Sequence, residues 1–343
     1  MRRREASASR TTFGPAAHRV GDGAARNVAP GSRPLRLAWG LVVLALAVGA
    51  NARAAEYRVV LETDSVYHHI IVAEDGVSRY LRFDRSLQSG MYLADPFDSP
   101  FLYAGYMHLG LLFRPQATRV LMVGLGGGSV QKRFWRDYPQ MTIDVAELDP
   151  KVVEVAHRYF AVREDPRLRI TVQDGRLFLR KTAQQYDMIL LDAYFAESIP
   201  FHLTTSEFVH LAHTRLAPGG IIVSNLIGAL EGPQSALFRA MYKTFATAFG
   251  GLYPFPTGFQ PSRDVDTLRN IILVASDQRG LTRWEILSKA RQVARRVTFP
   301  EFRTYAGDYY DGAIQSADVP VLTDDYAPVD TLLPIRNWTP RKP

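Results

Sequence analysis

Cysteine is absent from the 343 residues, and excess charge of one sign is confined to the first part of the chain. Without cysteine the protein has no disulfide, no thiol nucleophile and no thiolate metal ligand, and every cellular compartment stays open to it. Residues 1–36 hold eight Arg and two acids, and Arg53 adds one charge, so this part supplies the whole net charge of +7 (8 − 2 + 1). Because the remainder is neutral, nothing electrostatic favours a nucleic-acid partner, and we expect none.

Metal-binding patterns are missing as well. His68 and His69 are adjacent in an expected strand, where neighbouring side chains point to opposite faces. Glu207 and His210 share a helix face, but a single pair of this kind does not make a di-metal site. We therefore expect no metal cofactor.

A hydrophobic run long enough to cross a membrane is also missing. Residues 37–50 form a stretch of 14 residues without charge. A membrane-spanning helix requires about 20 residues. Arg33 and Arg36 precede this stretch and an A-x-A pattern, residues 52–54, follows it, which is the arrangement of a signal peptide.

We predict that residues 1–36, rich in Arg, Ala, Gly and Ser, form a disordered basic tail. Residues 37–54 then form a signal peptide or, alternatively, an N-terminal membrane anchor. Either form places the body of the protein outside the cytoplasm, as an exported periplasmic or membrane-anchored protein. A cytoplasmic protein is the alternative.

Glycine, in contrast, is concentrated in one turn between two apolar runs, Val120–Val123 and Ile143–Ala146. The turn contains Gly124, Gly126, Gly127 and Gly128. Ser129 follows as a helix N-cap, and the second run ends on Glu147 and Asp149. Strand, glycine turn, helix, strand and acid are the pattern of a nucleotide-binding βαβ unit, in which glycines let the backbone approach the ligand closely.

The spacing of Glu147 supports this interpretation. It lies 19 residues after Gly128 (147 − 128), at the tip of the second strand, where it can accept hydrogen bonds from both ribose hydroxyls. The alternative is a structural glycine turn beside a solvated acid. The last glycine of a dinucleotide fingerprint is Ser129 here, which weakens NAD as the ligand.

Two later strands also end on acids. Leu168–Val172 leads to Asp174 and Gly175, and Asp187–Leu191 leads to Asp192. The carboxyl ends of parallel strands form the ligand-binding edge of such sheets. Asp174 is placed to accept the adenine amino group, and Asp192 to face the reacting sulfonium of a nucleoside such as S-adenosylmethionine.

Strand and helix patterns alternate over residues 119–297, which predicts an α/β fold with a doubly wound, mostly parallel sheet. Before it, apolar strands around a hairpin signal at residues 74–76 predict a small N-terminal β domain at residues 55–100. A Rossmann-like nucleoside-binding transferase domain then spans residues 101–343.

A longer series of residues, spread over positions 62–226, matches one protein family. In chain order the series comprises Ser65, Val66, Tyr67, Asp84, Gln88, the glycine turn, Glu147–Pro150, Asp165–Arg167, Asp174, Gly175, Tyr186, Asp187 and Asp192. With it the chain resembles the spermidine synthase family, the polyamine aminopropyltransferases, which have a class I methyltransferase fold. The resemblance implies a transferase of polyamine biosynthesis whose co-substrate is decarboxylated S-adenosylmethionine or S-adenosylmethionine. It also implies which residues bind that co-substrate, namely Gln88, Gly124, Gly126, Gly127, Gly128, Glu147, Asp149, Asp174 and Gly175.

The chain departs from the family at three acids that hold the aminopropyl tail and the polyamine. These positions are Gly105, Gly127 and Phe195 here, which argues against efficient binding of a dication such as putrescine. Aminopropyl transfer to a small polyamine acceptor is what the resemblance implies. An S-adenosylmethionine-dependent methyltransferase with a non-polyamine acceptor, and a non-catalytic nucleoside-binding protein, are the alternatives. The sequence leaves open whether the protein forms a homo-oligomer.

The loop of residues 193–205 is expected to cover the acceptor. With Phe195 unable to serve as a base, Glu197 and His202 join Asp192 as candidate catalytic residues, and either of the two is alternatively a solvated loop residue. The acids of residues 322–330 either close the cleft or form a turn before Pro328. Tyr103 is expected to pack on the sheet.

Overall fold

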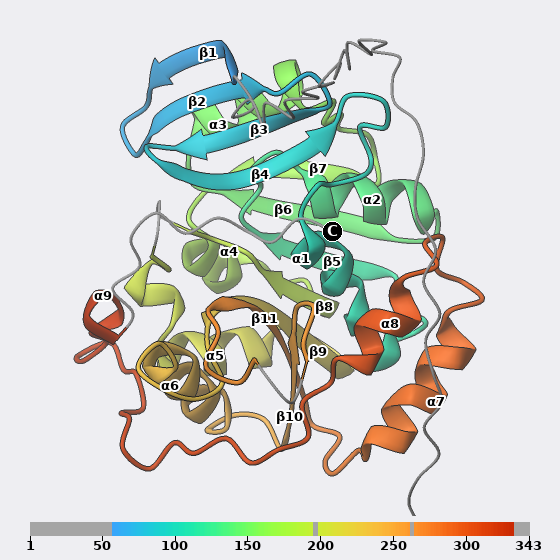
Figure 1. Ribbon diagram of the computed structural model, residues 1–343, viewed down its shortest axis with the longest axis vertical. Helices are drawn as coiled ribbons and strands as arrows, with labels where there is room; N and C mark the ends of the chain where they lie inside the picture. Colours follow the sequence, from blue (N-terminus) through green and yellow to red (C-terminus); the bar gives the residue numbers. More distant parts are fainter. Residues whose placement is uncertain (1–56, 195–197, 261–263, 333–343) are drawn as a thin grey trace, which may run out of the picture. The chain divides into compact units, whose positions relative to one another are not determined.

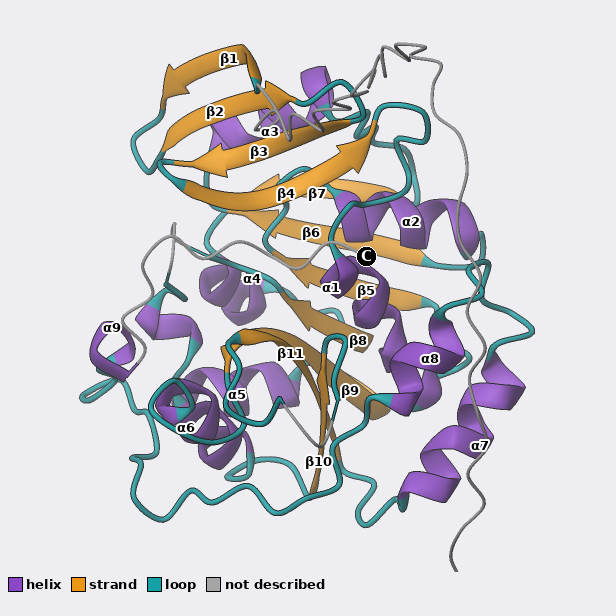
Figure 2. Ribbon diagram, viewed as in Figure 1, coloured by secondary structure: helices purple, strands orange, loops and turns teal. Residues whose placement is uncertain are grey.

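The computed structural model describes residues 57–194, 198–260 and 264–332, which all lie in one compact unit, residues 52–343. These residues build two β-sheets with helices around them (Figures 1 and 2). No helix in these described ranges has the length and apolarity needed to cross a membrane. The predicted basic tail and signal segment lie outside the described residues.

The first sheet has four antiparallel strands in chain order. They are β1 (Arg58–Asp64), β2 (His69–Glu74), β3 (Ser78–Phe83) and β4 (Ser86–Tyr92). The predicted hairpin joins β2 to β3, where Gly76 has φ +88° and Asp75 Oδ1 accepts hydrogen bonds from two backbone amides. Ile70, Val72 and Leu81 form the buried face of this sheet and pack against the helix that follows the second strand of the βαβ unit.

The second sheet has seven strands in the order β10-β11-β9-β8-β5-β6-β7. Their bounds are β5 (Arg119–Val123), β6 (Thr142–Glu147), β7 (Leu168–Val172), β8 (Tyr186–Leu191), β9 (Leu216–Gly228), β10 (Gly251–Pro256) and β11 (Arg269–Ser276). Strands β7, β6, β5, β8 and β9 are mutually parallel, and the β10–β11 hairpin is joined to them through β11, which is antiparallel to β9. The predicted doubly wound, mostly parallel sheet is therefore confirmed, whereas the boundary proposed between residues 100 and 101 stays a prediction.

Helices cover both faces of this sheet, because successive strand residues point to opposite faces and both sets are apolar. Val120 and Met122 of β5 face a core that includes α1 (Leu102–Tyr106), η1 (Met107–Leu112), α2 (Ser129–Asp137), α7 (Arg283–Val293) and α8 (Phe302–Gly307). Leu121 and Val123 face the opposite core, which includes α4 (Gly175–Lys181), η2 (Phe201–Leu203), α5 (Ser206–Thr214), α6 (Ala236–Phe245) and α9 (Val329–Leu332). Helix α3 (Pro150–Tyr159) packs against the four-stranded sheet (Figure 1).

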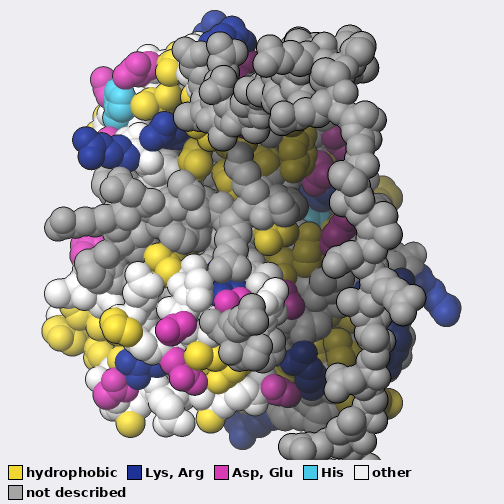
Figure 3. Space-filling model, viewed as in Figure 1, with side chains coloured by type: hydrophobic (Ala, Val, Ile, Leu, Met, Phe, Trp, Pro, Cys, Tyr) yellow, Lys and Arg dark blue, Asp and Glu magenta, His cyan; other side chains and the backbone are white. Residues whose placement is uncertain are grey.

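Charge on the described surface is mixed. In Figure 3, Lys and Arg side chains are interspersed with Asp and Glu over the described part of the visible face. Buried acids serve local structure in several places. Asp187, for example, accepts hydrogen bonds from Arg114 and from the Thr118 and Arg119 amides, which together outweigh the effect of burial and lower its pKa to about 2.

Candidate functional site

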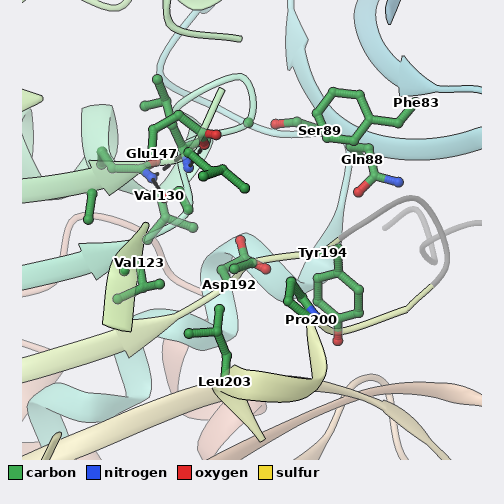
Figure 4. Close-up of a pocket in the computed structure, with 18 of the residues that line it drawn as sticks. Phe83, Gln88, Ser89, Val123, Val130, Glu147, Asp192, Tyr194, Pro200 and Leu203 are labelled. Atoms are coloured by element: carbon green, nitrogen blue, oxygen red, sulfur yellow. Dashed lines mark hydrogen bonds between the residues drawn. The ribbon is translucent and has the colours of Figure 1, made fainter. Parts of the chain in front are cut away.

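A cleft lies between the four-stranded sheet and the carboxyl ends of the parallel strands, the edge at which such sheets bind ligands (Figure 4). Its lining comes from both sheets and from the loop after β8. The lining includes His68, Phe83, Gln88, Ser89, Tyr103, Gly124, Leu125, Gly126, Glu147, Asp174, Gly175, Asp192, Tyr194, Pro200, His202 and Leu203. In Figure 4 the Asp192 carboxylate and the Gln88 amide point into the cleft from opposite sides.

The glycine turn lets the chain pass close to the tip of β8. Gly124 has φ +96°, and a Cβ there would lie 2.3 Å from the carbonyl oxygen of Asp192. Gly124 and Gly126 line the cleft, whereas Gly127 and Gly128 are not part of its lining. Gly128, not Ser129, is the N-cap of α2, and the Ser129 hydroxyl donates to the Gly90 carbonyl oxygen instead.

Glu147, the acid expected to bind the ribose, is held in the cleft by the backbone around it. Its Oε2 accepts from the Leu125 amide at 2.8 Å, and its Oε1 accepts from the Asp149 amide at 2.9 Å. Burial raises the pKa of Glu147 more than these two hydrogen bonds lower it. The carboxylate is thus oriented before any ligand arrives, and its remaining lone pairs are the acceptors that a ribose diol requires.

Asp149 does not line the cleft. It is fully buried, accepts from Ser65 Oγ at 2.5 Å and from the Lys151 amide at 2.8 Å, and lies 3.1 Å from His68 Nδ1. These contacts cap α3 and attach the segment before β2 to the carboxyl end of β6. The contact of Asp149 with the co-substrate, which the resemblance implies, stays a prediction.

Asp174 and His202 meet at another part of the cleft. Asp174 caps α4 by accepting from the Leu177 amide at 2.9 Å, and its Oδ2 lies 2.7 Å from His202 Nε2. Burial by itself raises the pKa of Asp174, but the hydrogen bonds from His202 and Leu177 outweigh it, so the pKa lies below its usual value. The next residue, Gly175, has no space for a side chain, because a Cβ there would lie 2.3 Å from Val123 Cγ1.

Asp192 lies at the tip of β8, deep in the cleft, with part of its surface open to it. Asn225 Nδ2 donates to Asp192 Oδ1 at 2.8 Å, and Asn270 Nδ2 donates to Asn225 Oδ1 at 2.9 Å. Burial raises the pKa of Asp192 to about 6, although the hydrogen bond from Asn225 opposes this shift. An acid with such a pKa changes its protonation state near neutral pH and is suited to proton transfer.

Sequence reasoning assigned no role in the site to Asn225 and Asn270, or to two tyrosines near Asp192. Tyr103 lines the cleft and donates to the Gln88 carbonyl oxygen at 3.0 Å, and Tyr194 donates to the Asn225 carbonyl oxygen at 2.8 Å. A signal was present for Asn225, because this polar residue ends the apolar run of residues 221–225, which has the pattern of a strand. Glu197 and Phe195 lie outside the described residues, so the predicted role of Glu197 stays a prediction.

Neighbouring side chains crowd two of the positions that lack a polyamine-binding acid, so a larger residue at either position would require them to shift. A Cβ on Gly105 would lie 2.7 Å from Tyr305 Cε2, and a Cβ on Gly127 would lie 2.9 Å from both Phe160 Cδ1 and Ser89 Oγ. Among the described residues, no group of three or more His, Cys, Asp or Glu is arranged to hold a metal ion.

Comparisons with known proteins agree with this geometry. Residues 103–233 match the spermine/spermidine synthase domain. A polyamine aminopropyltransferase from Vibrio vulnificus (strain CMCP6) is 31% identical over 286 residues, which cover 80% of this chain and 91% of that protein.

Two crystal structures share the fold. A probable spermidine synthase from Corynebacterium glutamicum superposes with a TM-score of 0.59 at 20% identity, covering 76% of this chain and 99% of that one. A spermidine synthase in complex with the transition-state analogue AdoDATO has a TM-score of 0.53 at 19% identity, covering 73% and 87% of the two chains. From the sequence match to the Vibrio protein and the domain match, the chain belongs to the spermine/spermidine synthase family.

Proposed function

We propose that the protein is a transferase that moves the aminopropyl group of decarboxylated S-adenosylmethionine to a small amine. The observation that carries the proposal is the position of Asp192, whose pKa of about 6 and hydrogen bond from Asn225 occur in the same cleft as Glu147 and Asp174. Membership of a family with polyamine aminopropyltransferases supports the same reaction.

The reaction is a displacement at the carbon bound to the sulfonium. The lone pair of the acceptor amine forms the new C–N bond, the C–S bond breaks, and its electron pair remains on sulfur to leave methylthioadenosine. The new ammonium then loses one proton. Asp192 is mostly ionised at pH 7, so it stabilises the cationic donor and can take this proton, while the remainder of the cleft contributes by holding the two reactants in line.

The direct test incubates the purified full chain with decarboxylated S-adenosylmethionine and putrescine, and measures methylthioadenosine and the aminopropylated amine together. We expect both products in equal amounts. An Asp192→Asn variant should bind methylthioadenosine and turn over at least about a hundredfold more slowly, as expected for loss of a proton-transfer group. Donor consumption without an alkylated amine would contradict aminopropyl transfer.

Methyl transfer from S-adenosylmethionine is a second candidate, supported by the glycines at positions 105 and 127, where the family resemblance implies acids. Without an acid near the ammonium of the donor tail, the decarboxylated donor loses a partner and the carboxylate of S-adenosylmethionine loses a repulsion. We therefore expect S-adenosylmethionine to bind at least as tightly as the decarboxylated donor does. The products distinguish the reactions, since methyl transfer leaves S-adenosylhomocysteine and aminopropyl transfer leaves methylthioadenosine. Tight nucleoside binding without either product would favour a non-catalytic binding protein.

A further inference from the structure

His202 and Asp174 form a pair whose position in the cleft differs from that of Asp192. The His202 ring uses Nε2 for Asp174, at 2.7 Å, whereas Asp192 is oriented by Asn225 and Asn270. With Asp174 ionised, Nε2 carries the hydrogen and donates it. The ring is therefore fixed on the acid expected at the nucleobase, and not on the acid expected at the reacting carbon.

The peptide of His202 is itself held by a second pair. Arg176 Nη1 donates to the His202 carbonyl oxygen at 3.2 Å, and the guanidinium donates to both carboxylate oxygens of Asp324, at 2.7 and 2.6 Å. Asp324 Oδ1 also accepts from Thr205 Oγ1 at 2.7 Å, and the Asp324 amide donates to Glu207 Oε2. A bidentate pair with these added hydrogen bonds has one favoured geometry.

Asp324 belongs to a segment distant in sequence, residues 308–332, which we call the C-terminal strap. Figure 1 shows the strap leaving α8, passing along the lower edge beneath α6 and reaching α9. Two hydrogen bonds attach it along this path. The Leu322 amide donates to Thr244 Oγ1, and the Ser206 amide donates to the Leu322 carbonyl oxygen. Near its end, Ser198 Oγ of the loop after β8 donates to Asp330 Oδ1 at 2.5 Å.

The chemistry of the pair bears on the choice of nucleobase. An ionised Asp174 can only accept hydrogen bonds, so it attracts the amino group of a 6-aminopurine and repels the carbonyl oxygen of a 6-oxopurine. One Oδ1 lone pair is used by the Leu177 amide, and His202 fixes the rotation of the carboxylate about its last bond. Without His202 the carboxylate is held by the Leu177 amide alone, and solvent takes the place of the ring.

We propose that His202 is a specificity-determining residue that holds Asp174 in the orientation selecting a 6-aminopurine nucleoside, and that Asp324 of the C-terminal strap positions His202 through Arg176. This rests on the proposed function only in that the cleft binds an adenosine-type donor. It assigns His202 a role other than general base, and it makes the strap part of the nucleoside site.

The experiment measures the binding of methylthioadenosine and of methylthioinosine, its 6-oxo analogue, to the full chain by calorimetry. We expect His202→Ala to lower the ratio of the two affinities roughly tenfold, because one charge-assisted hydrogen bond is lost. His202→Gln keeps an N–H donor and should retain most of the ratio. Asp324→Asn should lower the ratio several-fold, because its amide nitrogen opposes one Arg176 donor.

Asp318→Asn is the matched control, since Asp318 lies on the same strap and pairs with Arg239, and neither residue lines the cleft. It should leave the ratio unchanged, and thermal unfolding should show all variants folded. An equal loss of affinity for both nucleosides in His202→Ala would overturn the specificity role. An unchanged ratio with a flattened pH–rate profile would instead assign His202 as the base.

An unchanged ratio in Asp324→Asn, with a lowered one in His202→Ala, would overturn the role of the strap alone. Wild-type protein that binds neither nucleoside would overturn the proposed function and this inference together, whereas tight methylthioadenosine binding that no variant alters would overturn the inference and leave the proposed function standing.

Discussion

Two amides, rather than a cation, hold Asp192 in place. Asn225 and Asn270 are almost fully buried. Asn270 Nδ2 donates to Asn225 Oδ1, and Asn225 Nδ2 donates to Asp192 Oδ1. Neutral donors orient a carboxylate without neutralising it, so the raised pKa caused by burial is kept. A cation at the same point would lower that pKa and weaken the acid as a proton acceptor.

The first prediction concerns this chain of amides. The transfer rate should rise with pH through an apparent pKa near 6, because only ionised Asp192 accepts a proton. Asn225→Ala removes the hydrogen bond that lowers this pKa, so the rising limb should move to higher pH. In the same variant kcat/KM at pH 6 should fall about tenfold or more. The measurement is a pH–rate profile of kcat/KM.

Gln234→Ala is the control for this profile, because Gln234 is an exposed amide in the loop that follows β9. Its profile should match that of the wild type. If Asn225→Ala leaves the rising limb in place, the limb reports another group and the role assigned to Asp192 is wrong.

The second prediction concerns Glu147. Glu147→Ala removes the acceptors for two ribose hydroxyls and should weaken methylthioadenosine binding by about 1–3 kcal/mol, measured by calorimetry. Glu154→Ala, at an exposed acid of the following helix, should bind as the wild type does. Unchanged affinity in Glu147→Ala would remove the assignment of the ribose end of the cleft.

At the scale of elements, both the backbone conformation of the glycine turn and the packing around it require glycine at position 124. The third prediction is that Gly124→Ala destabilises the protein by about 2–4 kcal/mol in urea unfolding, since both a positive φ and a backbone clash oppose the added Cβ. Gly307→Ala, where a Cβ would meet nothing within 4 Å, should change stability by less than about 0.5 kcal/mol. Equal stability of the two variants would contradict this geometry of the turn.

Several elements formed where the sequence pattern indicated, with ends decided by contacts from elsewhere. The Thr204–Glu207 spacing is that of a capping box, but Thr205 caps α5 and Glu207 accepts a hydrogen bond from the amide of Asp324. Strand β10 was not predicted, and it contains Pro254 and Pro256, residues that a central strand does not tolerate. It forms because β10 is the edge of the sheet, where the missing amides need no partner.

For the whole molecule, location decides whether the donor is within reach. The fourth prediction is that the mature chain begins at Ala55, because the apolar stretch of residues 37–50 and the A-x-A pattern after it are read at the translocon before any reaction. N-terminal sequencing of the native protein from fractionated cells measures this. A cytoplasmic product that retains residues 37–50 would contradict export and strengthen the enzymatic proposal.

The sequence by itself determined the βαβ unit, the alternation of strands with helices and the acids at the strand tips. These features follow from local rules, namely the period of apolar residues, the conformations open to glycine and the spacing of helix and strand signals. Glu147, Asp174 and Asp192 were therefore predictable as residues of one edge, and the structure places all three in one cleft.

Only the tertiary structure decided which distant side chains complete that edge. Asn225 and Asn270 meet because the antiparallel register pairs Asn270 with Ile227, two residues from Asn225 on the same face. Tyr305 fills the space beside Gly105, and Asp324 reaches Arg176, because the chain returns from 200 (305 − 105) or 148 positions away. Strand register and the path of the chain do not follow from local sequence patterns. These contacts could therefore be identified only from the tertiary structure.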